Sequence, residues 1–298
     1  QPRNQGFDYS FGTEDNAYPS HHNPDNFVRN GEVLGKLEGY SCQILANEID
    51  KWFNDFYDKE KPFFLYTAFH EPHGPIASPP DLINKYSKYK DKDIGLPQNT
   101  SLAEYYANIE NMDIAIGRIL AILEKNNTLE NTFIFFASDN GPVRNGSQGG
   151  LRGLKGEVYD GGIKVPAIIY YPERIQESKK LNTPVWAQDI LPTLCDLAEV
   201  KPPRDINGIS FTPLFEGRSI QRAQPLFWFF YRSSPEVSLR EGDYILTGRK
   251  IDSIPRAHWI TDIDMAYIKN FEPQYFELYN VRTDPGQKHD LSSELPEK

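Results

Sequence analysis

The stretch TFIFFASDNGPVRNGSQGGLRGLK, Thr132–Lys155, carries the most information about the fold. Its apolar beginning, Thr132–Ser138, runs directly into Asp139 and Asn140, which predicts a buried strand that ends in a carboxylate and an amide. Open α/β folds bind ligands at such a sheet edge, and calcium favours oxygen donors of this kind. The glycine-rich loop that follows delivers Lys155, a cation for an anionic substrate group. The stretch therefore predicts a metal-assisted anion site.

The segments around this stretch alternate between helix-like and strand-like patterns. Apolar residues recur at helical spacing in residues 39–56, 101–125 and 185–200. Pro62–Phe69 is an unbroken apolar run typical of a buried strand, and Ile163–Tyr171 predicts another apolar strand. The order helix, strand, helix, strand, loop, strand, helix predicts an α/β fold with a mostly parallel sheet flanked by helices.

The pattern changes beyond about Arg222. Short strand-like pieces at Pro225–Tyr231, Asp243–Leu246 and Phe276–Val281 alternate with glycine, proline and charged residues, which predicts a small C-terminal antiparallel α+β subdomain. We therefore expect a catalytic α/β domain at residues 1–218 and this subdomain at 219–298. Residues 1–35 lack a clear period and are interpreted as a long binding loop.

Composition excludes two classes of protein. The net charge is −10 and the basic residues form no obvious block, so a nucleic-acid partner is not expected. No apolar run approaches the length that crosses a bilayer, so no membrane span is expected. The two cysteines, Cys42 and Cys195, fall within helix-like segments and are interpreted as buried thiols rather than a disulfide.

Several short sequence motifs, in the family's order along the chain, resemble those of the formylglycine-dependent sulfatases, a branch of the alkaline phosphatase superfamily. These motifs are QGFDYSFG (5–12), PFFLYTAFHEPHGP (62–75), FFASDNGP (135–142), LRGLKGEVYDGGIKVP (151–166), DILPTLCDLA (189–198) and FELYNVRTDP (276–285). The resemblance spans nearly the whole chain and implies an alkaline phosphatase/sulfatase-like fold, incomplete at its N-terminus. AYPSHHNPDNFVRNG (17–31) and FHEPHGP (69–75) also resemble bacterial polysaccharide sulfatases.

The resemblance implies a role for each residue of the anion site. Asp139 and Asn140 match two ligands of a Ca²⁺ ion, and Asp139 also matches a contact to the formylglycine nucleophile. His73 matches the histidine that contacts sulfate and gives a proton to the leaving alcohol, and Lys155 matches the lysine that grips the sulfate. Negative charge develops on the leaving oxygen, so a cation and a proton donor there stabilise the transition state. The expected catalytic residues are His73, Lys155 and Asp139.

Other residues are candidates for binding the substrate sugar, each with a structural alternative. His70 is interpreted either as a substrate contact or as a cap of the preceding strand. Arg152 lies in a charged loop, and such loops are usually solvated. The remaining candidates lie in the opening loop, and they are His21, His22 and Arg29.

The sequence also departs from the family pattern. The nucleophile word, Cys or Ser followed by x-Pro-x-Arg, is absent, and Ser253-Ile254-Pro255-Arg256 places its arginine one residue early. An upstream acidic pair that completes the calcium site is missing as well. We therefore expect the chain to be the latter part of a sulfatase, inactive alone, whose partner is the missing N-terminal segment of the same protein.

The resemblance implies a sulfuric ester hydrolase that acts on a sulfated oligo- or polysaccharide in the periplasm or outside the cell. One rival is a zinc phosphodiesterase or phosphatase of the same superfamily, but those enzymes tend to carry Asp-His where this chain has Asp139-Asn140, because zinc prefers imidazole nitrogen. The other rival is a non-catalytic carbohydrate-binding remnant, which the missing nucleophile makes credible.

Overall fold

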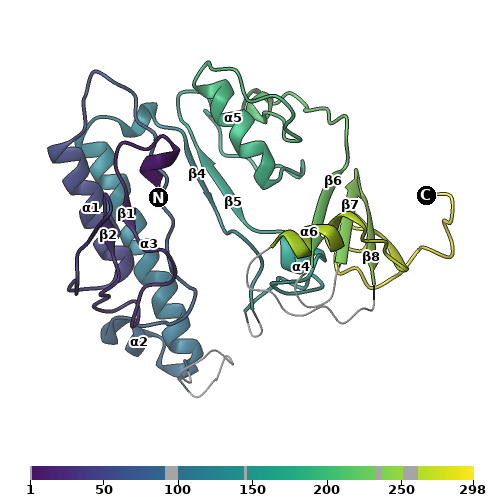
Figure 1. Cartoon of the computed structure of the whole chain (residues 1–298), viewed down its shortest axis with the longest axis horizontal. Coiled ribbons are helices and arrows are strands. Elements are labelled where there is room, and N and C mark those ends of the chain that lie inside the picture. Colours follow the sequence, from purple (N-terminus) through teal and green to yellow (C-terminus); the bar gives the residue numbers. More distant parts are fainter. Residues whose placement is uncertain (1, 91–99, 144–145, 232–235, 251–260) are drawn as a thin grey trace. The chain divides into compact units, whose positions relative to one another are not determined.

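The structure is a computed structural model, and it describes residues 2–90, 100–143, 146–231, 236–250 and 261–298. Contacts divide the chain into two units, Gln1–Thr132 and Phe133–Lys298, and each unit is described by itself (Figure 1). The expected division at residue 218 stays a prediction.

Two helices form the centre of the first unit. Helix α1, Ser41–Asp55, packs against α3, Leu102–Lys125 (Figure 1), and small residues let their backbones approach in a buried cluster of Cys42, Ala46 and Ala115. The side chain of Ser101 caps α3 by accepting a hydrogen bond from the Glu104 amide at 3.2 Å. Both helices confirm the expected helical segments.

Short elements complete this unit. They are the 3₁₀ helices η1 (Pro2–Gln5), η2 (Ser87–Tyr89) and η4 (Leu129–Asn131), helix α2 (Pro80–Lys85), and an antiparallel sheet of β1 (Phe11–Gly12), β2 (Val28–Arg29) and β3 (Glu32–Val33). The opening segment is therefore more ordered than the long loop that its irregular sequence predicts. Its Ala17 and Phe27 are buried against Ile44 and Leu45 of α1, and this contact holds the segment in place.

The strand expected at Pro62–Phe69 is not present in the structure. The segment pairs with no described strand, and Phe64 and Tyr66 are 60% and 73% exposed. An apolar run becomes a buried strand only where neighbouring strands accept its hydrogen bonds. The described part of this chain supplies none, so the segment remains without a sheet.

The second unit begins with a two-stranded sheet. Strands β4, Ile134–Ala137, and β5, Ala167–Tyr170, pair in register with Phe135 opposite Ile169. They confirm the two expected strands but pair antiparallel, and every strand pair among the described residues is antiparallel. The expectation of a mostly parallel arrangement is therefore not met. Between β4 and β5 the only described helix is the four-residue α4, Asp160–Ile163, whereas a parallel pair needs a long crossover, usually a helix.

Further helices belong to this unit. They are η5 (Ala187–Asp189), α5 (Ile190–Leu197) and η6 (Thr212–Glu216). Phe211, Leu214 and Phe215 form a buried cluster against Phe135 of β4, Ile169 of β5 and Phe133 just before β4. The helix expected at residues 185–200 is thus confirmed as η5 followed by α5.

The expected C-terminal antiparallel sheet is confirmed. Its four strands, in spatial order, are β6 (Leu226–Phe230), β7 (Glu236–Glu241), β8 (Tyr244–Arg249) and β9 (Tyr275–Asn280), and α6 (Asp262–Lys269) lies between β8 and β9 in the chain. Sequence reasoning missed β7 and α6. In β7 the polar residues Glu236 and Ser238 are the buried ones, whereas Leu239 on the other face is exposed.

Candidate functional site

The turn after β4 and the loop that carries Lys155 are joined by main-chain hydrogen bonds. The Lys155 amide donates to the carbonyl oxygen of Pro142 at 2.9 Å, and the Gly141 amide donates to the carbonyl of Gly162 at 2.8 Å. Asp139 and Asn140 lie immediately before these anchors. The structure thus places three of the predicted site residues, Asp139, Asn140 and Lys155, on two backbone segments joined by these hydrogen bonds, here called the stitched frame.

Glycine is required where these segments meet. A Cβ atom on Gly141 would lie 2.0 Å from the carbonyl oxygen of Gly161, and one on Gly162 would lie 2.1 Å from that of Glu157. A Cβ on Gly161 would lie 2.3 Å from the carbonyl oxygen of Gly153. The glycines of DNG and YDGG therefore let three backbone segments approach each other more closely than any side chain permits.

The oxygen donors beside this frame suit calcium in type but not in number. Asp139 is exposed, and the Asn140 amide nitrogen donates to the Gly141 carbonyl at 2.9 Å, which leaves its side-chain oxygen as an acceptor. Calcium takes six to eight oxygens. Within the described ranges, no group of three or more His, Cys, Asp or Glu side chains is arranged to hold a metal ion. These two residues alone do not form a complete calcium site.

Arg152 lies inside a network of hydrogen bonds. Its guanidinium donates to the hydroxyls of Tyr279 and Tyr159, to the Gln287 carbonyl and to the Glu277 carboxylate. These partners belong to the second unit and come mainly from its C-terminal part. The structure thus gives Arg152 an internal role, and its expected contact with substrate stays a prediction.

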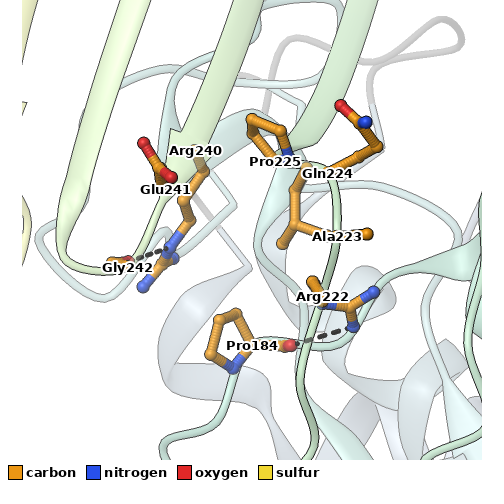
Figure 2. A pocket seen from close by; sticks show the side chains of 9 residues that line it. Pro184, Arg222, Ala223, Gln224, Pro225, Arg240, Glu241 and Gly242 are labelled. Atoms are coloured by element: carbon orange, nitrogen blue, oxygen red, sulfur yellow. Dashed lines mark hydrogen bonds between the residues drawn. The ribbon is translucent and has the colours of Figure 1, made fainter.

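A small pocket of about 150 Å³ lies beside the C-terminal sheet (Figure 2). Arg222 lines it, donates to the Pro184 carbonyl at 3.2 Å and forms an ion pair with the fully buried Asp189. Asp189 also accepts from the amide of Ile209 at 2.9 Å, which agrees with a structural role for this carboxylate. None of the predicted site residues lines this pocket.

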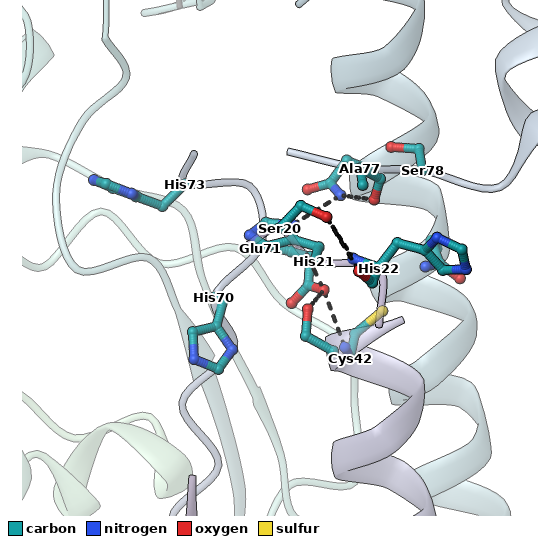
Figure 3. Close-up of polar contacts among 12 residues, drawn as sticks. Ser20, His21, His22, Cys42, His70, Glu71, His73, Ala77 and Ser78 are labelled. Atoms are coloured by element: carbon teal, nitrogen blue, oxygen red, sulfur yellow. Dashed lines mark hydrogen bonds and ion pairs between the residues drawn. The ribbon is translucent and has the colours of Figure 1, made fainter. Parts of the chain in front are cut away.

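In the first unit, His70 and His73 lie on the turn that follows Pro62–Phe69 (Figure 3). His73 is exposed and points away from the buried polar cluster around Glu71. Its Nδ1 lies 2.8 Å from the Gly74 carbonyl oxygen. Because a carbonyl only accepts, Nδ1 carries a proton and Nε2 is the nitrogen left for a ligand. His70 contacts the Thr13 hydroxyl at 2.7 Å, and burial lowers the pKa of His70.

Sequence reasoning missed Glu71, which anchors this turn. Its buried carboxylate accepts from the Ser41 hydroxyl and from the Cys42 amide at 3.0 Å, both in the first turn of α1 (Figure 3). The positive end of a helix favours a carboxylate there. The signal in the sequence is a glutamate between two histidines in a proline-rich turn, FHEPHGP.

The three candidates in the opening segment make internal contacts. His21 is fully buried, its Nδ1 lies 3.2 Å from the Asn108 amide nitrogen, and burial lowers its pKa. His22 stacks on Tyr40, and Arg29 forms an ion pair with Glu48. The structure gives no support to a direct sugar contact by the His21 ring, and the contacts expected of His22 and Arg29 stay predictions.

The turn that carries His70 and His73, the histidine turn, lies in the first unit, whereas Asp139, Asn140 and Lys155 lie in the second. The convergence of the two groups around one sulfate therefore stays a prediction. Both cysteines are free and buried, as expected. No helix in the described part of the chain is long and apolar enough to cross a membrane.

Comparison with solved structures identifies the fold. Ps i-CgsB matches over 99% of this chain and 64% of its own, with a TM-score of 0.78 and 22% sequence identity. A protein solved in complex with its substrate D-glucosamine-2-N,6-O-disulfate matches over 98% of this chain, with a TM-score of 0.71 and 18% identity. These neighbours confirm the alkaline phosphatase/sulfatase-like fold class.

Family models give the class of protein. The Sulfatase model matches residues 1–200, and the model described as N-sulphoglucosamine sulphohydrolase, C-terminal, matches residues 154–297. The chain therefore belongs to the sulfatase family.

Individual relatives are similar over much of the chain. A protein named Sulfatase from Formosa agariphila is 30% identical over 90% of this chain and 49% of its own length. The uncharacterized sulfatase YdeN of Escherichia coli is 27% identical over 100% of this chain and 55% of its own length. N-acetylgalactosamine-6-sulfatase of Rattus norvegicus is 27% identical over 82% of this chain. The chain spans about half the length of these relatives.

Proposed function

We propose that the protein is a sulfuric ester hydrolase that removes sulfate from a sulfated oligo- or polysaccharide. The observation that carries this proposal is the match of the Sulfatase family to residues 1–200, which include both the histidine turn and the stitched frame of Asp139, Asn140 and Lys155. Water replaces the alcohol on sulfur, and the products are sulfate and the free sugar hydroxyl.

The residues of this chain supply charge and a proton to that reaction. Lys155 is exposed at the end of a main-chain anchored loop, where its ammonium can bind an anionic oxygen of the sulfate. His73 presents Nε2, which in the protonated ring can give a proton to the leaving sugar oxygen. Both groups act where negative charge develops, so each favours the transition state over the ground state.

The remaining parts of the machinery belong to the family and are proposed for the whole protein. Asp139 and Asn140 would be two of the ligands of a Ca²⁺ ion, which holds sulfate oxygens when bound, and a formylglycine upstream of this chain would be the nucleophile. Because the described residues supply only part of a calcium sphere, the chain by itself is expected to be inactive. We place the protein in the periplasm or outside the cell on the same family grounds.

Carbohydrate is the favoured substrate class because of what related proteins bind. Ps i-CgsB has been solved with the carrageenan fragment k-i-k-neocarrahexaose, and another neighbour with a glucosamine disulfate. N-acetylgalactosamine-6-sulfatases are also among the relatives. Human steryl-sulfatase is 32% identical over 68% of this chain, so a steroid sulfate is the substrate class to test against.

The experiment measures sulfate release by the protein with its upstream segment, loaded with calcium. Sulfated carrageenan and glycosaminoglycan oligosaccharides are compared with steryl sulfate, aryl sulfate and phosphate esters. Lys155→Ala and His73→Ala should each lower turnover on the sulfated sugar by about 100-fold or more, whereas alanine at the exposed Lys201 should leave it unchanged. Release of phosphate without sulfate would identify the zinc-type phosphatase instead. Full turnover in both site variants would refute the roles of Lys155 and His73, and absence of any hydrolysis with retained sugar binding would support the non-catalytic alternative.

A further inference from the structure

No side-chain partner among the described residues fixes the Lys155 ammonium, so its position depends on the main chain of its loop. In the described part of the chain, this group takes part in no ion pair and no hydrogen bond, and the residue is exposed. A long lysine side chain has many rotamers, and fixing them costs entropy. The position of the Lys155 main chain therefore decides whether the charge reaches a sulfate.

Arg152 anchors that loop three residues before the lysine. Its carbonyl oxygen accepts from the Gly161 amide at 2.6 Å, and Lys155 follows with its own amide on Pro142 at 2.9 Å. Leu154, between them, donates its amide to the Glu157 carboxylate at 2.8 Å and accepts at its carbonyl from the Glu157 amide at 3.0 Å. The turn that carries Lys155 is thus fixed on both sides of the lysine.

The guanidinium of Arg152 joins this loop to the C-terminal sheet. Nη2 donates to the Tyr159 hydroxyl at 3.0 Å and to the Glu277 carboxylate at 3.3 and 3.4 Å. Nη1 donates to the Tyr279 hydroxyl and to the Gln287 carbonyl at 3.2 Å. Both terminal nitrogens therefore have two partners each. The cation also lies over the Tyr159 ring, 3.9 Å from its centroid.

Glu277, on β9, is the acidic centre of this network. Its carboxylate accepts from the Tyr159 hydroxyl as well as from Arg152. Burial works toward a higher pKa, but the hydrogen bond from Tyr159 and the charge of Arg152 hold the pKa of Glu277 below its ordinary value. A charged, half-buried carboxylate thus meets a guanidinium whose terminal nitrogens are both occupied.

A second link runs parallel to the first. The Asp160 amide donates to the side-chain oxygen of Gln287 at 2.8 Å, and Gln287 is fully buried. Tyr159 and Tyr279 belong to one buried cluster with Ile245 and Val281. The segment from Arg152 to Asp160 is therefore packed against the face of the C-terminal sheet at several points.

We infer that Arg152 and Glu277 are positioning residues that hold the Lys155 loop on the C-terminal sheet, so that this sheet sets the place of the sulfate-binding cation. The inference rests on the proposed function of Lys155. It gives the C-terminal sheet a role in catalysis, and it makes Arg152 a residue that supports the loop rather than one that contacts the substrate. The competing interpretation is that Arg152 binds sulfate directly and independently of Lys155.

The test is a double-mutant cycle between Glu277→Gln and Lys155→Ala in the calcium-loaded protein with its upstream segment. Glutamine keeps the shape of the side chain but removes the charge that holds Arg152. A misplacement of about 1 Å costs up to 100-fold, so we expect Glu277→Gln alone to lower kcat/KM by about 10- to 100-fold. In the Lys155→Ala background, the same change should cost less than about 3-fold, because the group that it positions is gone.

Two controls separate positioning from general damage. Asp243→Asn removes the exposed ion pair between Asp243 and Arg282 in the same part of the chain, 3.6 Å apart, and should leave kcat/KM unchanged. Tyr159→Phe removes only the hydroxyl that Glu277 and Arg152 share, and its cycle with Lys155→Ala takes the place of the first cycle if the glutamine variant does not fold.

The outcomes are distinct. An equal loss from Glu277→Gln in both backgrounds, or no loss in the wild-type background, overturns the inference. An additive loss from Arg152→Ala in the Lys155→Ala background would show that Arg152 contacts the substrate itself, and it overturns the inference too. If Lys155→Ala alone has no effect, the proposed function of Lys155 fails and the inference falls with it, whereas a large Lys155 effect without coupling overturns the inference alone.

Discussion

Replacing Gly141 by alanine should destabilise the second unit and displace Lys155. The new Cβ would lie 2.0 Å from the Gly161 carbonyl oxygen and 2.9 Å from the Gly162 Cα, whereas real Cβ contacts almost never fall below 3.0 Å. The two segments must therefore separate by about 1 Å, which lengthens the hydrogen bond between the Gly141 amide and the Gly162 carbonyl from 2.8 Å to about 3.8 Å. Overpacking costs about 1–3 kcal/mol and an unmade buried hydrogen bond about 1–3 kcal/mol, so we expect a loss of about 2–6 kcal/mol.

The assay is equilibrium unfolding in urea, followed by tryptophan fluorescence. Trp186 and Trp228 lie in the second unit with ring centroids 5.8 Å apart, and Trp52 lies in the first unit, so the emission reports on both units. The matched control is Gly117→Ala on the exposed face of α3, where no atom lies within 4 Å of the added carbon. This control should stabilise its helix by up to about 1 kcal/mol. An unfolding midpoint for Gly141→Ala equal to that of the wild type would refute the close approach and the frame built on it.

Two further predictions concern buried carboxylates of the second unit. Asp189→Ala leaves Arg222 without its buried partner and should lower the free energy of unfolding by about 3–5 kcal/mol. The control Arg218→Ala removes an exposed ion pair with Glu216 and should lower it by less than about 1 kcal/mol. Equal urea midpoints for the two variants would contradict this difference. Burial, with the nearby charges of Glu157 and Glu277, raises the pKa of Glu236, so the protonated form favours folding and its contribution is lost as pH rises through that pKa. Glu236→Gln should therefore be more stable than the wild type at pH 7, and this advantage should shrink as pH falls toward the ordinary pKa of glutamate; thermal unfolding across pH would show a constant difference if the carboxyl were not perturbed.

Local patterns in the sequence predicted the helices well. The apolar spacing that defines α1 and α3 depends on residues three or four apart, and the start of α3 is set by Ser101 and Glu104. The segment Pro62–Phe69 shows the opposite case. Its apolar run predicted a buried strand, but a strand exists only through partners elsewhere in the chain, and the described part offers none.

The candidate site divides in the same way. Asp139, Asn140 and Lys155 could be proposed from the sequence because each follows a recognisable local signal, an apolar strand or a glycine-rich loop. Glu71 was missed, and the internal hydrogen bonds of Arg152 were not foreseen, because both depend on contacts with distant residues. Glu71 meets Ser41 30 residues earlier, and Arg152 meets Glu277 125 residues later.

The sequence alone therefore determined the chemical types in the candidate site, an oxygen-rich turn after a strand, a histidine turn and a lysine in a glycine-rich loop, as well as the family to which the chain belongs. Only the tertiary structure decided the antiparallel pairing of β4 with β5, the glycine contacts that join Gly141 to Gly161, and the anchoring of Arg152 on the C-terminal sheet. The physical reason is range. Side-chain chemistry and helical periodicity are local properties, whereas strand direction, close backbone contact and the pairing of buried charges depend on which distant segments fold against each other.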